Sequence, residues 1–101
     1  MKLSIIIPVY NEEQTIKLIL EKVLDNQYSN KEIIIVDDCS TDKSIEKLEK
    51  FKGRSEIKII KHEINKGKGA CLKTASKVIT GDICLIQDAD LEYDPIEHVR
   101  L

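Results

Sequence analysis

The sequence has few aromatic residues and little excess charge of either sign. Only 4% of its 101 residues are aromatic and none is Trp, so the stacking surfaces on which proteins bind single-stranded nucleic acid are scarce. Sixteen Lys and Arg against 18 Asp and Glu leave a formal charge of −2, which gives no general attraction for phosphate backbones or anionic lipid. The composition therefore argues against a nucleic-acid-binding protein.

Cysteine and long apolar runs are also scarce. The three cysteines have no C-x-x-C spacing, which argues against a disulfide framework or a cysteine-rich zinc site and favours a reducing cytoplasm. We expect each to be a small residue of the core or of the edge of a site. The apolar start of the chain is too short for a signal peptide, and no run approaches the ~20 residues of a membrane span.

Short apolar runs rich in β-branched residues alternate with segments of helical spacing. Four of these runs are typical of strands buried on both faces: Leu3–Val9, Ile33–Val36, Ile57–Ile60 and Ile83–Ile86. They predict four strands.

Three helices are predicted between the strands. The first has apolar residues from Ile16 to Leu24, with Asn11 and Gln14 spaced as in a capping box. The second surrounds Ile45 and Leu48, with cap candidates in the segment 40–42 and an end near Gly53. The third runs from about Gly69 to Ile79, with four residues directed inward: Ala70, Cys71, Ala75 and Val78.

This order predicts an α/β fold. Connections too long for hairpins imply parallel strands with right-handed crossovers, hence a three-layer α/β/α arrangement around a mostly parallel sheet of about four strands. We expect one domain over residues 1–101. Because Asp94-Pro95 begins a helix only a few residues before Leu101, we expect it to be the front half of a longer protein.

In open parallel sheets, ligands bind beyond the carboxyl ends of the strands. The segment Pro8–Glu13 follows the first strand, where a helix N-terminus could hold an anion and Tyr10 offers a flat face to a base; the alternative is simply a capped helix. The second strand ends in Asp37-Asp38. One of these carboxylates is placed to bind ribose hydroxyls, and the other to cap the next turn.

The fourth strand is followed by an acidic segment. Six carboxylates and no Lys or Arg lie between residues 82 and 97, so their mutual repulsion is costly unless a cation relieves it or they are fully solvated. Carboxylate oxygens suit Mg²⁺ or Mn²⁺. The sequence predicts a divalent-metal site at Asp88, Asp90 and Glu92.

A basic segment with closely spaced glycines precedes the third helix. Residues 58–77 hold six lysines that face few acids, among them Lys66 and Lys68. The segment could approach a diphosphate, but it lacks the Walker and G-x-G-x-x-G patterns, and a solvated helix face is the alternative. His62 and His98 have no partners at metal-binding spacing, and we interpret them as incidental.

In this order the motifs resemble family 2 glycosyltransferases, over essentially all 101 residues. The matching segments are Ile7–Glu12, Ile35–Ser40, His62–Gly69 and Asp88–Glu92; none is specific alone, but their joint order is. The pattern looks most like the dolichol-phosphate mannosyltransferase-like branch, although Glu92 stands where that branch often has Gln. The resemblance implies a Rossmann-like nucleotide-binding half with the GT-A fold.

The resemblance also implies roles for individual residues. It assigns the nucleotide-sugar to a set of ten residues: Pro8, Val9, Tyr10, Glu12, Val36, Asp38, Lys68, Asp88, Ala89 and Asp90. Asp38 would reach the base or ribose, and Asp88, Asp90 and Glu92 would hold Mg²⁺ or Mn²⁺ on the diphosphate. The catalytic base is expected in an acceptor-side half outside this chain, so the chain alone should be inactive.

By the same resemblance the intact protein transfers a sugar from a UDP- or GDP-linked donor to a lipid-phosphate or saccharide acceptor. It would be cytoplasmic, with peripheral association at the membrane face. Two alternatives remain. One is an inactive nucleotide-binding fragment or interaction module. The other is a receiver-like Mg²⁺-binding signalling domain, whose acidic pair would be expected after the first strand, where Pro8–Asn11 stand instead.

Overall fold

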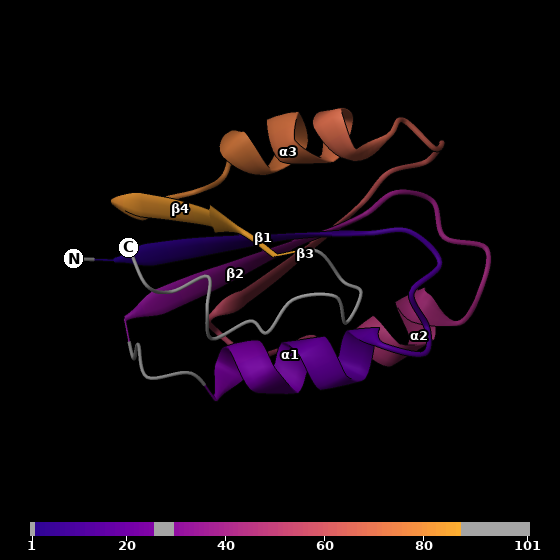
Figure 1. Cartoon of the computed structure of the whole chain (residues 1–101), viewed down its shortest axis with the longest axis horizontal. Coiled ribbons are helices and arrows are strands. Elements are labelled where there is room, and N and C mark those ends of the chain that lie inside the picture. The colour runs from indigo at the N-terminus through magenta and orange to yellow at the C-terminus, as the bar shows by residue number, and fades with distance from the viewer. Residues whose placement is uncertain (1, 26–29, 88–101) are drawn as a thin grey trace.

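A computed structural model describes residues 2–25 and 30–87 of the chain. Its elements follow the order β1 (Leu3–Val9), α1 (Ile16–Leu24), β2 (Lys31–Asp37), α2 (Ser44–Glu49), β3 (Ile57–Lys61), α3 (Lys68–Ser76) and β4 (Ile83–Ile86). Every strand pair is parallel, and the sheet order is β3-β2-β1-β4. Helices α1 and α2 cover one face of the sheet and α3 covers the other (Figure 1), which confirms the predicted three-layer α/β/α class.

Two apolar clusters hold the layers together, because side chains alternate across each strand. On the α1 and α2 face, Ile5 and Ile7 of β1 and Ile33 and Ile35 of β2 pack with the buried face of α1. That face consists of Ile16, Ile19, Leu20 and Val23. On the other face, the buried members of the smaller cluster are Ile6, Ile34, Val36, Cys71 and Ala75.

The two outer strands of the described sheet are less buried than predicted. Lys58 in β3 is exposed, and β4 alternates between half-buried and exposed positions. Each of these strands pairs with only one neighbour among the described strands, so the expectation of burial on both faces is wrong for them and correct for β1 and β2. Cys71 lies in the core and Cys39 is partly buried at the sheet edge, whereas Cys84 on β4 is exposed; all three are free thiols.

The helix ends differ from the predicted ones. Helix α1 begins at Ile16 with Thr15 as its N-cap and has no side-chain cap, so the predicted capping box of Asn11 and Gln14 is wrong. Asn11 instead has a left-handed backbone, with φ of 52°. Helix α2 begins at Ser44, and α3 ends at Ser76, before the predicted Ile79.

The strand order decides between the predicted fold and the receiver-domain alternative. The order β3-β2-β1-β4 corresponds to the 3-2-1-4 arrangement of Rossmann-type sheets, whereas receiver domains have the flavodoxin-like order 2-1-3-4-5; the receiver alternative is therefore wrong.

The helix predicted at Asp94-Pro95 lies outside the described residues. Over residues 2–25 and 30–87, none of the helices has the length and apolar character needed to cross a bilayer.

Candidate functional site

Three strand ends meet at one edge of the sheet. β1 lies between β2 and β4, with Val9 opposite Asp37 and Ile6 opposite Ile86. The backbone amide of Gln87 donates to the Ile6 carbonyl at 2.9 Å, so the chain still runs beside β1 at the last residue described. The predicted ligand residues Asp88, Ala89, Asp90 and Glu92 follow directly in sequence and lie outside the described residues.

The loop after β1 presents an aromatic face at this edge. Tyr10 is 47% exposed although it directly follows the buried Val9. Pro8 is half-buried, while Val9 and Val36 are buried and belong to the two apolar clusters beneath the edge. Of these four predicted residues, Tyr10 and Pro8 are accessible, whereas the two valines are buried on opposite faces of the sheet.

The backbone amides before α1 are engaged by the loop that follows β2. The amide of Asn11 donates to Ser40 Oγ at 2.9 Å, that of Glu12 to Ser44 Oγ at 2.8 Å, and that of Glu13 to Asp42 Oδ2 at 3.1 Å. In this structure the amides of residues 11–13 therefore have protein acceptors and are not open to an anion.

The side chain of Asn11 also accepts hydrogen bonds from the loop that follows β2. Its side-chain carbonyl accepts from the amides of Thr41 at 2.7 Å and Asp42 at 3.3 Å, and Lys47 Nζ donates to the carbonyl of Glu13. The Tyr10-bearing loop and the β2–α2 loop are thus fastened to each other through both backbones.

The adjacent carboxylates of Asp37 and Asp38 have different partners. Asp37 Oδ1 accepts from Ser40 Oγ at 2.6 Å, and its Oδ2 accepts from the Ser40 amide at 3.1 Å. Asp37 therefore stabilises the turn after β2. This is the capping role expected for one member of the pair.

Asp38 is turned toward the segment after β3. Its Oδ1 lies 2.8 Å from His62 Nδ1 and accepts from the Lys66 amide at 2.9 Å, while its Oδ2 accepts from the Gly67 amide at 2.8 Å. Burial opposes the charged form, but the hydrogen bonds from His62 and the two amides outweigh it and hold the pKa of Asp38 below its usual value. Asp38 is therefore a buried carboxylate that holds a loop.

His62 is not incidental, which corrects the interpretation from sequence. Its Nδ1 faces Asp38 and its Nε2 lies 2.8 Å from Thr74 Oγ1 of α3. Because ionised Asp38 can only accept, Nδ1 carries a proton. The available signal was its position: His62 directly follows β3, at the same edge as Asp38.

Asp38, His62 and Cys71 bring three potential metal-ligand atoms within 4.8 Å of one another. Both carboxylate oxygens and both ring nitrogens already have hydrogen-bond partners. Burial, reinforced by the nearby Asp38 and Asp37 charges, raises the pKa of the Cys71 thiol to about 11, which disfavours the thiolate that binds metals. Asp38, His62 and Thr74 form a hydrogen-bond network, and Cys71 lies beside it with a neutral thiol.

The basic segment divides into two groups. Lys58 pairs with Glu32 at 3.3 Å and Lys61 with Glu49 at 2.9 Å, so these two do face acids, contrary to the expectation. The other lysines are exposed on the loop and on or just beyond α3: Lys66, Lys68, Lys73 and Lys77. Lys68 is the first residue of α3 and follows Gly67, which Asp38 holds.

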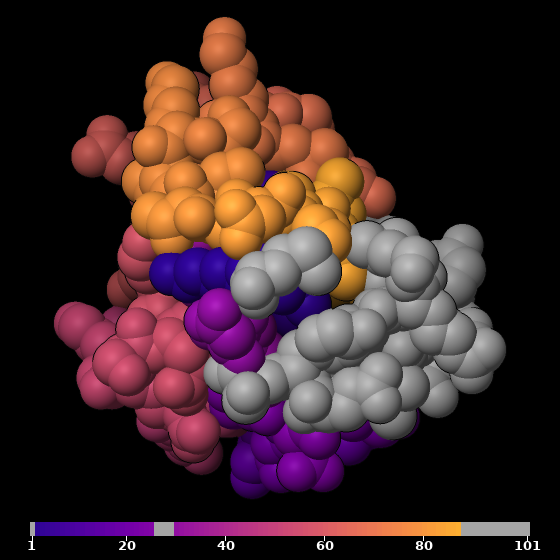
Figure 2. Space-filling model, turned by 90° about the vertical axis from the view of Figure 1, so that its left-hand side faces the viewer, coloured from indigo at the N-terminus to yellow at the C-terminus, as the bar shows by residue number. Residues whose placement is uncertain are grey.

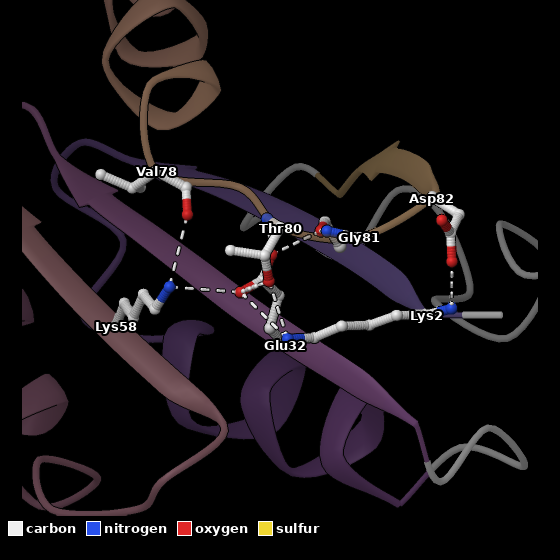
Figure 3. Close-up of polar contacts among 8 residues, drawn as sticks. Lys2, Glu32, Lys58, Val78, Thr80, Gly81 and Asp82 are labelled. Carbon is white, nitrogen blue, oxygen red and sulfur yellow. Dashed lines mark hydrogen bonds and ion pairs between the residues drawn. The ribbon is translucent and has the colours of Figure 1, made fainter.

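A second buried carboxylate lies at the opposite edge of the sheet. Glu32 accepts hydrogen bonds from Ser4, from the amide and hydroxyl of Thr80, and from Lys58 (Figure 3). Seen from that edge, the start of the chain lies between the α3–β4 segment and the segments of β2 and β3 (Figure 2). Glu32 therefore ties three strands and the α3–β4 connection together, far from the Tyr10 loop.

A cavity of about 310 Å³ opens between α2 and β3, walled by Leu48, Ile57 and Ile59. Its lining contains none of the residues predicted to bind nucleotide. Its lining is mixed: Ile45, Leu48, Ile57 and Ile59 are apolar, whereas Glu49, Lys52 and Lys61 are charged.

Comparison with known proteins places these features in a family. The model of glycosyl transferase family 2 matches residues 4–99. The chain is 35% identical over 97 residues to a dolichol-phosphate mannosyltransferase of Pyrococcus furiosus, covering 94% of this chain and 27% of that protein.

Two solved glycosyltransferase structures are similar to this chain. TarS of Staphylococcus aureus in complex with UDP-GlcNAc superposes with a TM-score of 0.82 at 33% identity, over 89% of this chain and 27% of that one. A mannosyltransferase of Pyrobaculum calidifontis in complex with GDP-Man and Mn²⁺ gives a TM-score of 0.82 at 28% identity, over 88% and 27%. The chain thus spans about a quarter of the length of these relatives.

Proposed function

Since the chain belongs to glycosyl transferase family 2, we propose that it forms the nucleotide-binding part of an enzyme that moves a sugar from a nucleoside diphosphate to an acceptor. One observation carries the proposal: β2, β1 and β4 are adjacent and parallel, so the Tyr10 loop, Asp38 and Gln87, the last described residue before the acidic segment, lie at one sheet edge. A donor needs this combination of an aromatic face for its base and carboxylates for a cation on its diphosphate.

The nucleoside is proposed to bind over the loop after β1. Tyr10, exposed beside half-buried Pro8, supplies a flat surface for a base, and Glu12 follows on the same loop. The hydrogen bonds that Asn11 Oδ1 accepts from the amides of Thr41 and Asp42 keep this loop in place before a ligand arrives, which lowers the ordering cost of binding. Val9 and Val36 are buried beneath this edge on opposite faces of the sheet and support it from the two apolar clusters.

The diphosphate is proposed to bind with a divalent cation held by the segment after Gln87. Asp88, Asp90 and Glu92 offer carboxylate oxygens, the donor type that Mg²⁺ and Mn²⁺ prefer, and a solved relative contains Mn²⁺ with GDP-Man. The cation would neutralise charge that develops on the leaving diphosphate. Ala89 lies between the two aspartates, and Lys68 adds positive charge from the start of α3.

The acceptor is proposed to be a polyprenyl phosphate. One similar protein is named for dolichol phosphate, whereas TarS is named a poly(ribitol-phosphate) β-N-acetylglucosaminyltransferase, so a saccharide or polyol polymer is the second candidate. A phosphate acceptor is already anionic and needs little help from a general base. The acceptor site and any base are proposed to lie outside this chain, and action at the membrane face follows from a lipid acceptor.

Calorimetric titration of UDP, GDP and their sugar conjugates, each with and without Mn²⁺, tests the donor proposal. We expect metal-dependent binding of one nucleotide class. Asp90→Asn should remove the dependence on Mn²⁺ with the fold intact, whereas Asp25→Asn, a matched change just after α1, should not. Equal binding with and without metal in the unaltered chain, or unchanged metal dependence in Asp90→Asn, would contradict the assignment.

A further inference from the structure

The loop after β1 and the loop after β2 lie side by side at one end of the sheet (Figure 1), and each contains a residue with an unusual backbone. Asn11 has a φ of 52° and Cys39 a φ of 63°. Among residues 2–25 and 30–87, they are the two non-glycine residues with a positive φ. A left-handed backbone is unfavourable for residues with a Cβ, less so for Asn, and it persists where surrounding contacts require it. The contacts around Tyr10 supply that requirement.

Both peptide bonds that flank Tyr10 are hydrogen-bonded to the loop after β2. The carbonyl of Val9, in the peptide before Tyr10, accepts from the amide of Asp38 at 2.8 Å. The amide of Asn11, in the peptide after Tyr10, donates to Ser40 Oγ at 2.9 Å. The orientations of these two peptides fix φ and ψ of the residue between them, and hence the direction of its Cα–Cβ bond. A side chain that is 47% exposed is thus held through its backbone rather than by burial.

A fully buried carboxylate supports the second of these hydrogen bonds. Asp37 is 0% exposed, and its Oδ1 accepts from Ser40 Oγ at 2.6 Å. Because an ionised carboxylate only accepts, the Ser40 hydroxyl gives its single hydrogen to Asp37 and turns its oxygen toward the Asn11 amide. The short, charge-assisted bond to Asp37 fixes this arrangement. A chain of contacts therefore runs from the end of β2 through Ser40 to the peptide beside the exposed ring.

The side chain of Asn11 makes a second connection between the two loops. Its Oδ1 accepts from the amides of Thr41 at 2.7 Å and Asp42 at 3.3 Å. Residue 11 therefore meets two requirements, a left-handed backbone and a short side chain with an acceptor oxygen. Glycine would meet only the first of them, whereas aspartate would meet both. Substitution can thus separate the two requirements.

We propose that Asn11 and Ser40 are positioning residues for the nucleoside: they fix the aromatic face of Tyr10 in the direction in which a base stacks on it. This inference rests on the proposed function, in which Tyr10 supplies that face. It goes further by separating two parts of the donor site. The clasp formed by Asn11 and Ser40 serves the base, whereas the cation and the diphosphate depend on other residues. A change at the clasp lowers the affinity for nucleotides and leaves the affinity for pyrophosphate unaltered.

Affinities for UDP, GDP and inorganic pyrophosphate, each with Mn²⁺, separate these two parts. We compare the unaltered chain with Asn11→Gly, which keeps the backbone and loses the acceptor, with Asn11→Asp, which keeps both, and with Ser40→Ala. Gln14→Gly is the matched control, because it adds backbone freedom at an exposed position of the same connection. Each nucleotide affinity is divided by the pyrophosphate affinity, so that the charge added in Asn11→Asp, which acts on both ligands, cancels.

We expect Asn11→Gly and Ser40→Ala to lower this affinity ratio about five- to tenfold, a part of what a base gains by stacking on an aromatic ring. Asn11→Asp should recover most of the ratio, and Gln14→Gly should leave it unchanged. The ¹⁵N order parameter of the Tyr10 amide should fall in Asn11→Gly and Ser40→Ala but not in Asn11→Asp. Three results would overturn the proposal: equal losses for nucleotide and pyrophosphate, an unchanged order parameter at Tyr10, or a loss in Asn11→Asp as large as that in Asn11→Gly.

A measurement on the unaltered chain covers the case in which a variant fails to fold. The amides of Asn11 and Thr41 should exchange slowly with water although both residues are exposed, because Ser40 and Asn11 accept from them. Exchange at the rate of an unprotected amide would overturn the inference. Absence of nucleotide binding to the unaltered chain would instead contradict the proposed function, while the order parameter of Tyr10 in the variants would still decide whether the clasp holds it.

Discussion

At the scale of single residues, burial decides what a carboxylate does. Asp37 and Asp38 are adjacent, but alternation along β2 sends one to the Ser40 turn and the other to His62. The sequence predicted that the pair would divide its roles, and Asp37 confirms the capping half. It could not predict that Asp38 would be satisfied by a histidine 24 residues away, because no local pattern marks a pairing between two strand ends.

Glu32 gives a prediction at the same scale. Burial alone would raise its pKa, but hydrogen bonds from Ser4, Thr80 and Lys58 lower it to about 2. A pKa lower in the folded than in the unfolded state stabilises the fold above the unfolded value, near 4.5, and this contribution is lost as the pH falls toward 2. We expect about 3 kcal/mol of unfolding free energy to depend on it.

Urea unfolding of the unaltered chain and Glu32→Gln from pH 7 to pH 2.5 checks this. The variant should be less stable at pH 7, and the difference should shrink below pH 4. Glu46→Gln, an exposed change on α2, should show no such convergence. A stability difference that stays constant down to pH 2.5 would mean that the charge of Glu32 contributes nothing.

At the scale of elements, the apolar patterns predicted type and order well. Buried β-branched runs locate β1 and β2, and the spacing of Ile16, Ile19 and Val23 identifies α1. The predicted N-terminal cap of α1 was wrong because Asn11 has a partner elsewhere in the fold. Its side chain accepts a hydrogen bond from the β2–α2 loop instead of capping its own helix. The capping-box pattern takes into account only hydrogen bonds between residues close in sequence, so it cannot anticipate that Asn11 bonds to a residue 30 positions away.

The hydrogen bond between the segment before α1 and the first residue of α2 predicts the effect of Ser44→Ala. Ser44 is fully buried and its Oγ accepts from the Glu12 amide, so its removal leaves that donor unsatisfied. We expect a loss of about 1–2 kcal/mol in the free energy of unfolding, measured with urea. Ser55→Ala, in an exposed turn, is the control and should change it by less than about 0.5 kcal/mol. Equal stability of the two variants would remove Ser44 from this role.

At the scale of the molecule, the parallel order β3-β2-β1-β4 joins sequence segments that are far apart. The α/β class followed from the alternation of strands and helices. The edge proposed for the site follows from the rule that ligands bind at the carboxyl ends of strands. The network of Asp38, His62 and Thr74 did not, because it depends on the positions of β2, β3 and α3 relative to one another. The part of the site that sequence predicted least well is thus the part that tertiary packing creates.

The central claim is that a nucleoside diphosphate with its cation binds at this edge, and mapping backbone amide signals tests it most directly. Titration of the chain with UDP or GDP and Mg²⁺ should shift signals at Tyr10, in the 65–69 loop and from Asp88 to Glu92, with Mg²⁺ and nucleotide together exceeding either alone. Signals around the cavity at Leu48 and Ile57 should not move. Shifts concentrated at that cavity, or spread evenly over the surface, would contradict the account.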